Sequence, residues 1–162
     1  MKKAVFLDRD GVINYESGNY TCNVNDFIIN NGVGEAIKLL KNNGYLVIII
    51  SNQGGIAKKL YTHLDLLEMH IKLCEYLMGY NTSIDDFYYC PHHESVSKCL
   101  CRKPKSLLFE KAIAVHNIDV SESYMIGDKD RDIIPARDCG IKGFLIKPNT
   151  NIYEICKSII KS

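Results

Sequence analysis

The sequence has no hydrophobic run long enough to cross a membrane and no large excess of charge of either sign. Its longest apolar run, residues 46–50, falls far short of the roughly 20 residues that a bilayer-spanning helix needs. Lysine and arginine total 20 and aspartate and glutamate 19, which gives a formal net charge of +1. Because these charges are also mixed along the chain, the sequence predicts binding neither to nucleic acid nor to a membrane surface.

Signals for secretion and for nucleotide binding are missing as well. The apolar stretch that begins at Ala4 ends at Asp8, whereas the hydrophobic region of a signal peptide is longer. There is no GxGxxG or Walker-type phosphate loop, which argues against a nucleotide-binding P-loop enzyme. We therefore expect a cytoplasmic protein.

The chain has 162 residues, of which 46% are hydrophobic, so it can bury one substantial core. It shows no internal repeat, low-complexity tract or second core. We therefore expect residues 1–162 to form a single domain. The sequence does not determine the oligomeric state, and a monomer is the working expectation.

Short apolar runs alternate with segments of helical periodicity. This alternation predicts an α/β fold, a Rossmann-like parallel sheet with helices on both faces. A capping box at Thr62 and Asp65 opens one helix, Pro135 is tolerable only near the first turn of its helix, and Thr150 would cap the last helix. Strands are expected at residues 3–7, 46–50, 87–89, 124–126 and 143–146, and helices at residues 34–43, 62–78, 106–116, 131–139 and 151–160.

Polar residues follow three of the predicted strands directly. Asp8, Ser51 and Asp128 each come just after a strand, and ligands of parallel sheets bind beyond the carboxyl ends of the strands. Asp8 and Asp10 lie two residues apart before Gly11, a pattern that suits Mg²⁺. A carboxylate can also attack phosphorus as a nucleophile. A surface loop with a turn glycine is the alternative interpretation of this segment.

Four short segments, in order, resemble the haloacid-dehalogenase superfamily of phosphatases. Residues 8–11 read Asp-Arg-Asp-Gly, Ser51 ends the second strand, Lys103 comes later, and residues 127–132 read Gly-Asp-Lys-Asp-Arg-Asp. These segments match the first to fourth motifs of the superfamily and span nearly the whole chain.

The resemblance implies a chemical role for each matching residue. Asp8 would be the nucleophile and a Mg²⁺ ligand, and Asp128 a second side-chain ligand. Asp10 would act as general acid and then base, and its backbone carbonyl would also bind Mg²⁺. Ser51 and Lys103 would offset charge on the transferring phosphoryl group.

Asp132 has two interpretations. It would either support the outer shell of the Mg²⁺ site or be a helix N-terminal acid that the helix dipole stabilises.

A second cluster combines cysteine and histidine. Cys90, His92, Cys99 and Cys101 form a C-x-H…C-x-C set, which would give a closed tetrahedral Zn²⁺ site of the structural type. His93 could replace His92, and a loop of free thiols is the alternative to a metal site. The odd total of seven cysteines argues against a disulfide framework.

Arg102-Lys103-Pro104 follows this cluster directly. The combination resembles a zinc-containing subfamily without a cap domain, whose phosphatases act on D-glycero-D-manno-heptose 1,7-bisphosphate or on histidinol phosphate. The resemblance implies an open cleft in which a zinc-tied loop holds Arg102 and Lys103 over the phosphoryl site.

Between these substrates, the loop after Asp8 and the segments around Ser51 and Cys90 resemble the phosphatases of the heptose type, which implies removal of the 7-phosphate of the heptose bisphosphate. The short stretch between His92 and Cys99 is nearer to the histidinol-phosphate type, and Glu16 could bind the amine of that substrate. Either way the partner is a small phosphorylated metabolite. The expected substrate contacts are Glu16, Ser17, Gly18, Asn19, Asn52, Arg102 and Lys129.

Two functions without phosphatase turnover are alternatives. A phospho-acceptor signalling domain would use the same aspartate cluster, but Asp10, an acid/base two residues after the nucleophile, argues for turnover. A zinc module that binds nucleic acid disagrees with the balanced charge and the single zinc set.

Overall fold

Five parallel strands form one sheet at the centre of the protein, in a computed structural model that describes residues 1–161. The strand order is β3-β2-β1-β4-β5, and every neighbouring pair is parallel. The strands are β1 (Ala4–Leu7), β2 (Leu46–Asn52), β3 (Asp86–Cys90), β4 (Tyr124–Gly127) and β5 (Lys142–Leu145). The predicted fold class, a parallel sheet between helices, is confirmed.

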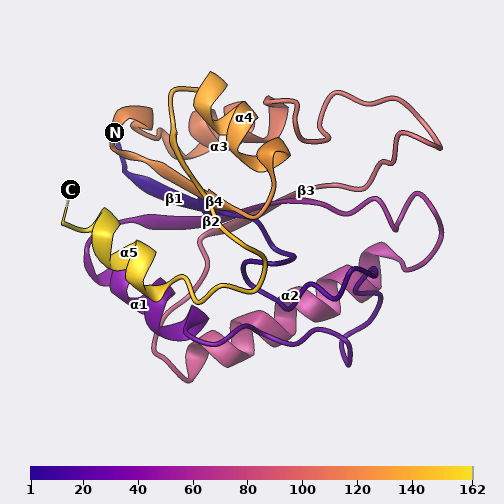
Figure 1. Cartoon of the computed structure of the whole chain (residues 1–162), viewed down its shortest axis with the longest axis horizontal. Coiled ribbons are helices and arrows are strands. Elements are labelled where there is room, and N and C mark those ends of the chain that lie inside the picture. The colour runs from indigo at the N-terminus through magenta and orange to yellow at the C-terminus, as the bar shows by residue number, and fades with distance from the viewer. Residues whose placement is uncertain (162) are drawn as a thin grey trace.

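Helices cover both faces of this sheet (Figure 1). On one side lie α1 (Val33–Asn42), α2 (His63–Met78) and α5 (Tyr153–Ile159). On the other side lie α3 (Leu107–His116) and α4 (Asp130–Asp138), with the short 3₁₀ helix η1 (Val120–Glu122) leading into β4.

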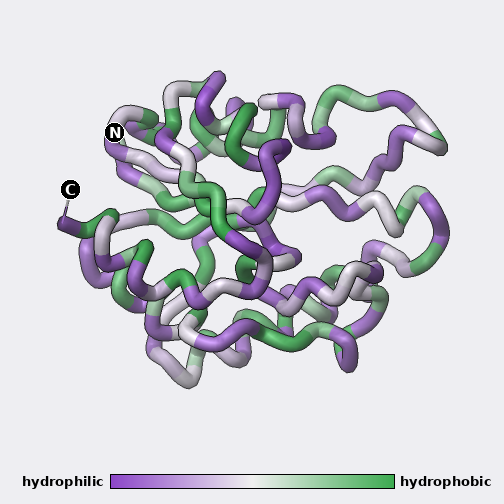
Figure 2. The backbone as a smooth tube through the Cα atoms, in the orientation of Figure 1, coloured by the Kyte–Doolittle hydropathy of each residue, from purple (hydrophilic) through white to green (hydrophobic). Residues whose placement is uncertain are grey.

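The central strand β1 is apolar along its whole length (Figure 2), because both of its faces are covered. Successive side chains of a strand point to opposite faces. Val5 and Leu7 of β1 therefore belong to the core under α1, α2 and α5, whereas Ala4 and Phe6 belong to the core under α3 and α4.

The capping box predicted at the start of α2 is present. The Thr62 hydroxyl accepts a hydrogen bond from the Asp65 N–H, and the Asp65 carboxylate accepts one from the Thr62 N–H. This reciprocal pair satisfies two N–H groups at the helix start and fixes where α2 begins.

Three sequence predictions of element ends are wrong. Thr150 does not cap the last helix, because its hydroxyl donates to the Lys147 carbonyl; the Asn151 side chain instead accepts from the Tyr153 N–H, where α5 begins. The last strand lies one residue earlier than expected, at Lys142–Leu145. Pro135 lies in the second turn of α4 rather than the first.

The carboxyl ends of all strands point to the side opposite both termini (Figure 1). The loops after β1, β2 and β3 gather at this edge, and among residues 1–161 no separate cap domain is inserted between them. Within the same residues, no helix is long and apolar enough to span a bilayer. The edge is therefore covered only by loops.

Candidate active site

Asp8 lies directly beyond β1, where its N–H donates to the Ile126 carbonyl of β4 at 3.0 Å. The Lys103 ammonium donates to Asp8 Oδ1 at 2.8 Å and to the Ile50 carbonyl at 2.7 Å. The same ammonium lies 2.6 Å from Asp132 Oδ1. All three charged side chains are buried, so the site is a desolvated carboxylate–ammonium–carboxylate group.

Burial dominates the electrostatics of this group. It raises the pKa of Asp8 to about 7, even though the neighbouring Lys103 opposes the rise. Burial would lower the pKa of Lys103, but the Asp8 and Asp132 carboxylates raise it above its ordinary value. Lys103 is therefore charged at neutral pH.

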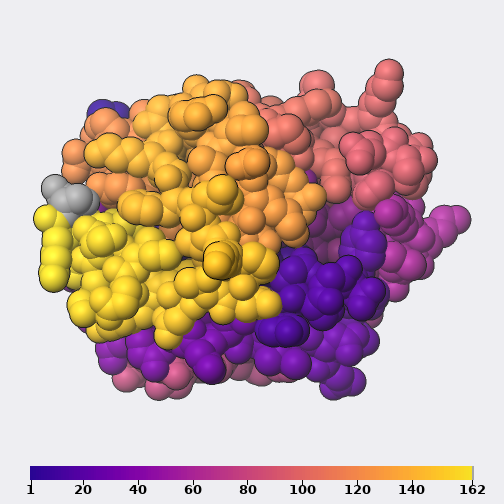
Figure 3. All heavy atoms as spheres, in the orientation of Figure 1, coloured from indigo at the N-terminus to yellow at the C-terminus, as the bar shows by residue number. Residues whose placement is uncertain are grey.

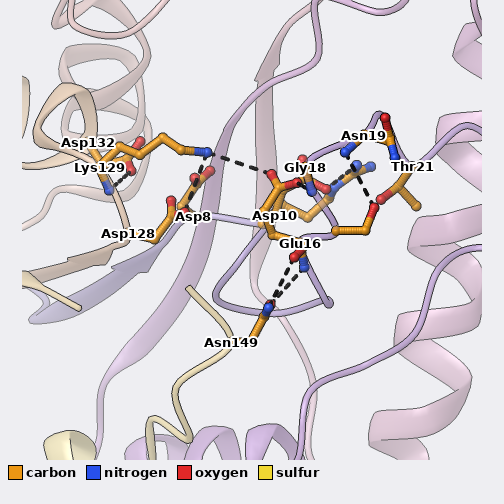
Figure 4. A network of polar contacts seen from close by, with 12 residues as sticks. Asp8, Asp10, Glu16, Gly18, Asn19, Thr21, Asp128, Lys129, Asp132 and Asn149 are labelled. Carbon is orange, nitrogen blue, oxygen red and sulfur yellow. Dashed lines mark hydrogen bonds and ion pairs between the residues drawn. The ribbon is translucent and has the colours of Figure 1, made fainter. Parts of the chain in front are cut away.

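Asp8, Asp128 and Asp132 each present an oxygen within 4.8 Å of the others (Figure 4). Among the described residues, neither Asp128 oxygen accepts a hydrogen bond, and burial raises the pKa of this carboxyl. The Lys129 ammonium lies 3.5 Å from Asp128 Oδ2 and offsets part of its charge. Buried carboxylate oxygens that accept no hydrogen bond, next to other carboxylates, fit a hard divalent cation with oxygen ligands, such as Mg²⁺.

Gly11 is required for this arrangement. Its φ is +85°, a conformation that glycine adopts readily. A Cβ at this position would also lie 2.7 Å from Asp128 Oδ2. Any side chain would therefore displace the carboxylate that the cation site needs.

Asp10 is held by donors on both of its oxygens. Oδ1 accepts from Arg9 at 2.7 Å and from Asn14 at 3.0 Å, and Oδ2 accepts from Gln53 at 3.1 Å. Burial would raise the pKa of Asp10, but Arg9 and these hydrogen bonds bring it below its ordinary value. Asp10 is therefore ionised before substrate binds.

Ser51 and Lys103 are fixed by Gln53 and Asn52, at and just beyond the end of β2. Ser51 Oγ accepts from Gln53 Nε2 at 2.5 Å. The Asn52 amide donates to the Lys103 carbonyl at 3.0 Å and accepts from the Lys103 N–H at 2.9 Å. Asn52, expected as a substrate contact, thus also orients the lysine.

A polar cavity of about 260 Å³ opens above these residues. It brings together most of the predicted site residues, whereas Ser17 and Lys129 do not line it, and Ser51, Lys103 and Asp128 are buried nearby. The lining residues are Asp8, Arg9, Asp10, Glu16, Gly18, Asn19, Tyr20, Thr21, Asn52, Gly54, Tyr61, Arg102 and Arg131.

Glu16 anchors the loop after Asp10. Its Oε1 accepts from the Gly18 N–H at 2.7 Å, and its Oε2 lies 3.6 Å from the Lys129 ammonium. The Asn149 amide accepts from the Glu16 N–H at 2.7 Å and donates to its carbonyl at 3.1 Å (Figure 4). This clamp places the indigo N-terminal loop against the C-terminal segments (Figure 3).

The predicted metal cluster on the loop after β3 also comes together. Cys90, His92, Cys99 and Cys101 each offer a donor atom within 4.8 Å of the others. The sulfurs of Cys90 and Cys99 lie 3.7 Å apart, and His92 Nδ1 lies 3.3 Å from the Cys101 sulfur. Zinc–sulfur bonds of about 2.3 Å give similar separations, so this donor set fits Zn²⁺. His93 instead contacts Ser95 Oγ at 2.8 Å.

Sequence reasoning missed several residues of this site, among them Arg131, Gln53, Tyr61 and Asn149. Arg131 lines the cavity. It belongs to the fourth motif, one residue before Asp132, so the motif could have identified it as a site residue. The other three of these residues are part of the site through contacts with other segments of the chain, and no local sequence pattern predicts such contacts.

Comparison with known proteins identifies the family. A family model described as HAD-hydrolase-like matches residues 100–154. The D-glycero-beta-D-manno-heptose-1,7-bisphosphate 7-phosphatase of Haemophilus ducreyi is 41% identical over 87% of this chain and 80% of its own length. The enzyme of the same name from Vibrio cholerae is 40% identical over 98% of this chain and 90% of its own.

The chain belongs to this family of haloacid-dehalogenase-like phosphatases. A solved structure agrees with the assignment, namely the D,D-heptose 1,7-bisphosphate phosphatase of B. bronchiseptica with magnesium and phosphate. Its TM-score is 0.86 at 27% identity, and the match covers 96% of this chain and 86% of that one. The protein is therefore a phosphatase, and the sequence prediction of a phosphomonoesterase is confirmed.

Proposed function

We propose that this phosphatase removes the 7-phosphate of D-glycero-beta-D-manno-heptose 1,7-bisphosphate through an aspartyl phosphate on Asp8. The two relatives described above are both named for this activity. The observation that carries the mechanism is the buried group of Asp8, Lys103 and Asp132 beside the Asp128 carboxylate, whose oxygens accept no hydrogen bond among the described residues.

In the first step, a carboxylate oxygen of Asp8 attacks phosphorus while the bond from phosphorus to the sugar oxygen breaks. Asp10 gives a proton to the departing alkoxide. Its pKa is low in the free site, and the arrival of an anionic phosphate next to it raises that pKa and favours protonation. Lys103 and the Ser51 hydroxyl offset charge on the transferring phosphoryl group.

In the second step, Asp10, now ionised, removes a proton from water, which attacks phosphorus. The bond between Asp8 and phosphorus breaks, and inorganic phosphate leaves. When bound, Mg²⁺ would be held by Asp8, the Asp10 carbonyl and Asp128 and would offset the negative charge that converges there.

We also propose that Cys90, His92, Cys99 and Cys101 hold a structural Zn²⁺. All four positions of a tetrahedral ion would be filled by protein, which leaves none for catalysis. The Arg102 guanidinium donates to the His92 carbonyl at 3.1 Å. The ion would thus hold Arg102 at the cavity and reduce the number of conformations available to the loop.

The charges at the cavity rim support a bisphosphate substrate. Arg102 and Arg131 line the cavity, and a guanidinium can bind phosphate oxygens in bidentate fashion. Lys129, 41% exposed, lies 3.6 Å from Glu16, which also lines the cavity. Glu16, which would have to bind the amine of histidinol phosphate, is already engaged by Gly18 and Lys129.

Two further expectations remain proposals. We expect residues 1–162 to fold as one domain, since a single sheet carries both cores. We expect a monomer in the cytoplasm, where the three cysteines of the proposed zinc site would stay reduced.

The direct test compares the heptose 1,7-bisphosphate with histidinol phosphate in the presence of Mg²⁺. We expect kcat/KM for the bisphosphate to be at least about tenfold higher, a difference of ~1.4 kcal/mol. Phosphorus NMR of the product should show loss of the 7-phosphate and retention of the 1-phosphate. A preference for histidinol phosphate that Glu16→Gln selectively weakens would reverse the substrate assignment.

A further inference from the structure

One buried amide connects the two residues that carry the proposed proton transfer and phosphoryl binding. Gln53 is 1% exposed. Its Nε2 donates to Ser51 Oγ at 2.5 Å and to Asp10 Oδ2 at 3.1 Å. Because an amide nitrogen carries two N–H groups, both of its donors are used at this site.

This double donation has a consequence for Ser51. A hydroxyl group donates one hydrogen bond and accepts two. Since Ser51 Oγ accepts from Gln53, its own proton remains available for a phosphoryl oxygen. The same amide holds Oδ2 of Asp10, while Arg9 and Asn14 hold Oδ1. Gln53 thereby orients both groups at once.

The amide works only in one of its two orientations. Rotation by half a turn would place Oε1 against the Asp10 carboxylate and remove both donors. The Tyr61 hydroxyl donates to Gln53 Oε1 at 2.6 Å and so favours the useful orientation. Burial raises the pKa of Tyr61, so the hydroxyl stays protonated as a donor.

Tyr61 is itself held in place by local structure. It immediately precedes Thr62, whose capping box fixes the start of α2. Its ring lies against Gly55, where a Cβ would come within 2.1 Å of a ring carbon. The start of the helix and this glycine together define where the tyrosine hydroxyl points.

We propose that Gln53 is a positioning residue that orients Asp10 and Ser51, and that Tyr61 acts through Gln53 by fixing the direction of its amide. The inference rests on the proposed roles of Asp10 and Ser51. It predicts that loss of either side chain slows turnover more than it weakens substrate binding, because neither residue needs to touch the substrate.

The test is a double-mutant cycle with p-nitrophenyl phosphate and Mg²⁺ on the full chain. We expect Gln53→Leu to lower kcat at least about tenfold and Tyr61→Phe about three- to tenfold, each with KM within about twofold of wild type. In the Gln53→Leu background, Tyr61→Phe should change kcat by less than about 1.5-fold, because the amide through which it acts is gone.

Tyr88→Phe is the matched control. Tyr88 is also a buried tyrosine with a hydroxyl contact, 3.3 Å from His116 Nε2, but it lies outside the cavity. We expect this variant to keep wild-type kcat and KM. A thermal melt of each variant separates loss of fold from loss of positioning.

Three outcomes would overturn the proposal: Tyr61→Phe with unchanged kcat, Tyr61→Phe with a raised KM alone, or full additivity in the double variant. If Gln53→Leu does not fold, the kcat and KM of Tyr61→Phe decide. Failure of the wild-type protein to hydrolyse p-nitrophenyl phosphate would instead count against the proposed function.

Discussion

The Lys103 ammonium lies 2.8 Å from Asp8 Oδ1 and ties the proposed nucleophile to a loop 95 positions further along the chain. It also lies 2.6 Å from Asp132 Oδ1, and all three side chains are buried. One lysine thus joins the strand ends of β1 and β2 to the start of α4. Lys103 therefore has a structural function in addition to its proposed catalytic one.

Lys103→Met should destabilise the protein as well as inactivate it, because it leaves Asp8 and Asp132 buried and unpaired. We expect the free energy of unfolding in EDTA to fall by about 3–5 kcal/mol, as for other broken buried pairs. Urea unfolding measures this. Adding Asp132→Asn should restore part of the loss.

The control for Lys103→Met is Lys41→Met. Lys41 pairs with Asp85 at 2.5 Å, but at a more exposed position. Loss of this ion pair should lower the free energy of unfolding by about 1 kcal/mol or less. Equal losses of unfolding free energy in the two variants would contradict the claim that burial makes the Lys103 pairs more stabilising.

Protein purified without added metal should contain close to one equivalent of Zn²⁺ by elemental analysis. Cys99→Ser should lose the ion, and kcat should fall because Arg102 and Lys103 follow the loop. Cys74→Ser, which changes an exposed thiol on α2, is the control and should keep both the zinc ion and the wild-type kcat. Wild-type protein without zinc, or full activity in Cys99→Ser, would exclude the structural ion.

Arg102→Ala and Arg131→Ala should each lower kcat/KM for the heptose bisphosphate about tenfold or more, and much less for p-nitrophenyl phosphate. The second phosphate of the bisphosphate supplies the difference. Arg137→Ala, in the same helix as Arg131 but outside the cavity lining, should leave both substrates unaffected. Equal losses for the two substrates would place the arginines at the scissile phosphate instead.

His70 should make stability depend on pH. Burial against the Phe87 ring, 4.2 Å away between centroids, lowers the pKa of His70 to about 4 from an ordinary 6.5. Between pH 6.5 and pH 4, the unfolded chain therefore binds a proton at His70 more readily than the folded chain does. The folded state loses stability as pH falls through this interval. The loss is about 1–3 kcal/mol.

The measurement is urea unfolding of wild type and His70→Gln between pH 6.5 and pH 4.5. The variant should lose less stability over this interval. His63→Gln, which changes an exposed histidine of the same helix, should follow the wild-type curve. Parallel curves for wild type and His70→Gln would contradict the assignment.

The sequence predicted the fold and the strand-end residues because both follow from local patterns. Asp8, Ser51 and Asp128 come directly after apolar runs, and parallel strands bring such positions to one edge. The capping box of α2 needed only Thr62 and Asp65, three positions apart.

Contacts between distant segments were not predictable in this way. Asn149 meets Glu16 across 133 positions, and Gln53 meets Asp10 across 43. Both contacts depend on the register of the sheet, which single residues do not encode. The error at Thr150 has a local cause instead, because its hydroxyl donates to the Lys147 carbonyl three positions earlier.

Asp10→Asn should retain the nucleophile but lose the proton transfers that release and then hydrolyse the phosphoryl group. We therefore expect it to accumulate phosphoryl enzyme with an activated substrate such as p-nitrophenyl phosphate, whose leaving group needs little protonation. Asp8→Asn should abolish turnover with the fold intact, since the side-chain volume barely changes.

The most direct test of the covalent mechanism is mass spectrometry of Asp10→Asn quenched in acid during incubation with substrate and Mg²⁺. The account predicts one added phosphoryl group, on the peptide that contains Asp8, and none in the Asp8→Asn/Asp10→Asn double variant. Phosphoryl transfer to any other residue, or substantial turnover by Asp8→Asn, would contradict it.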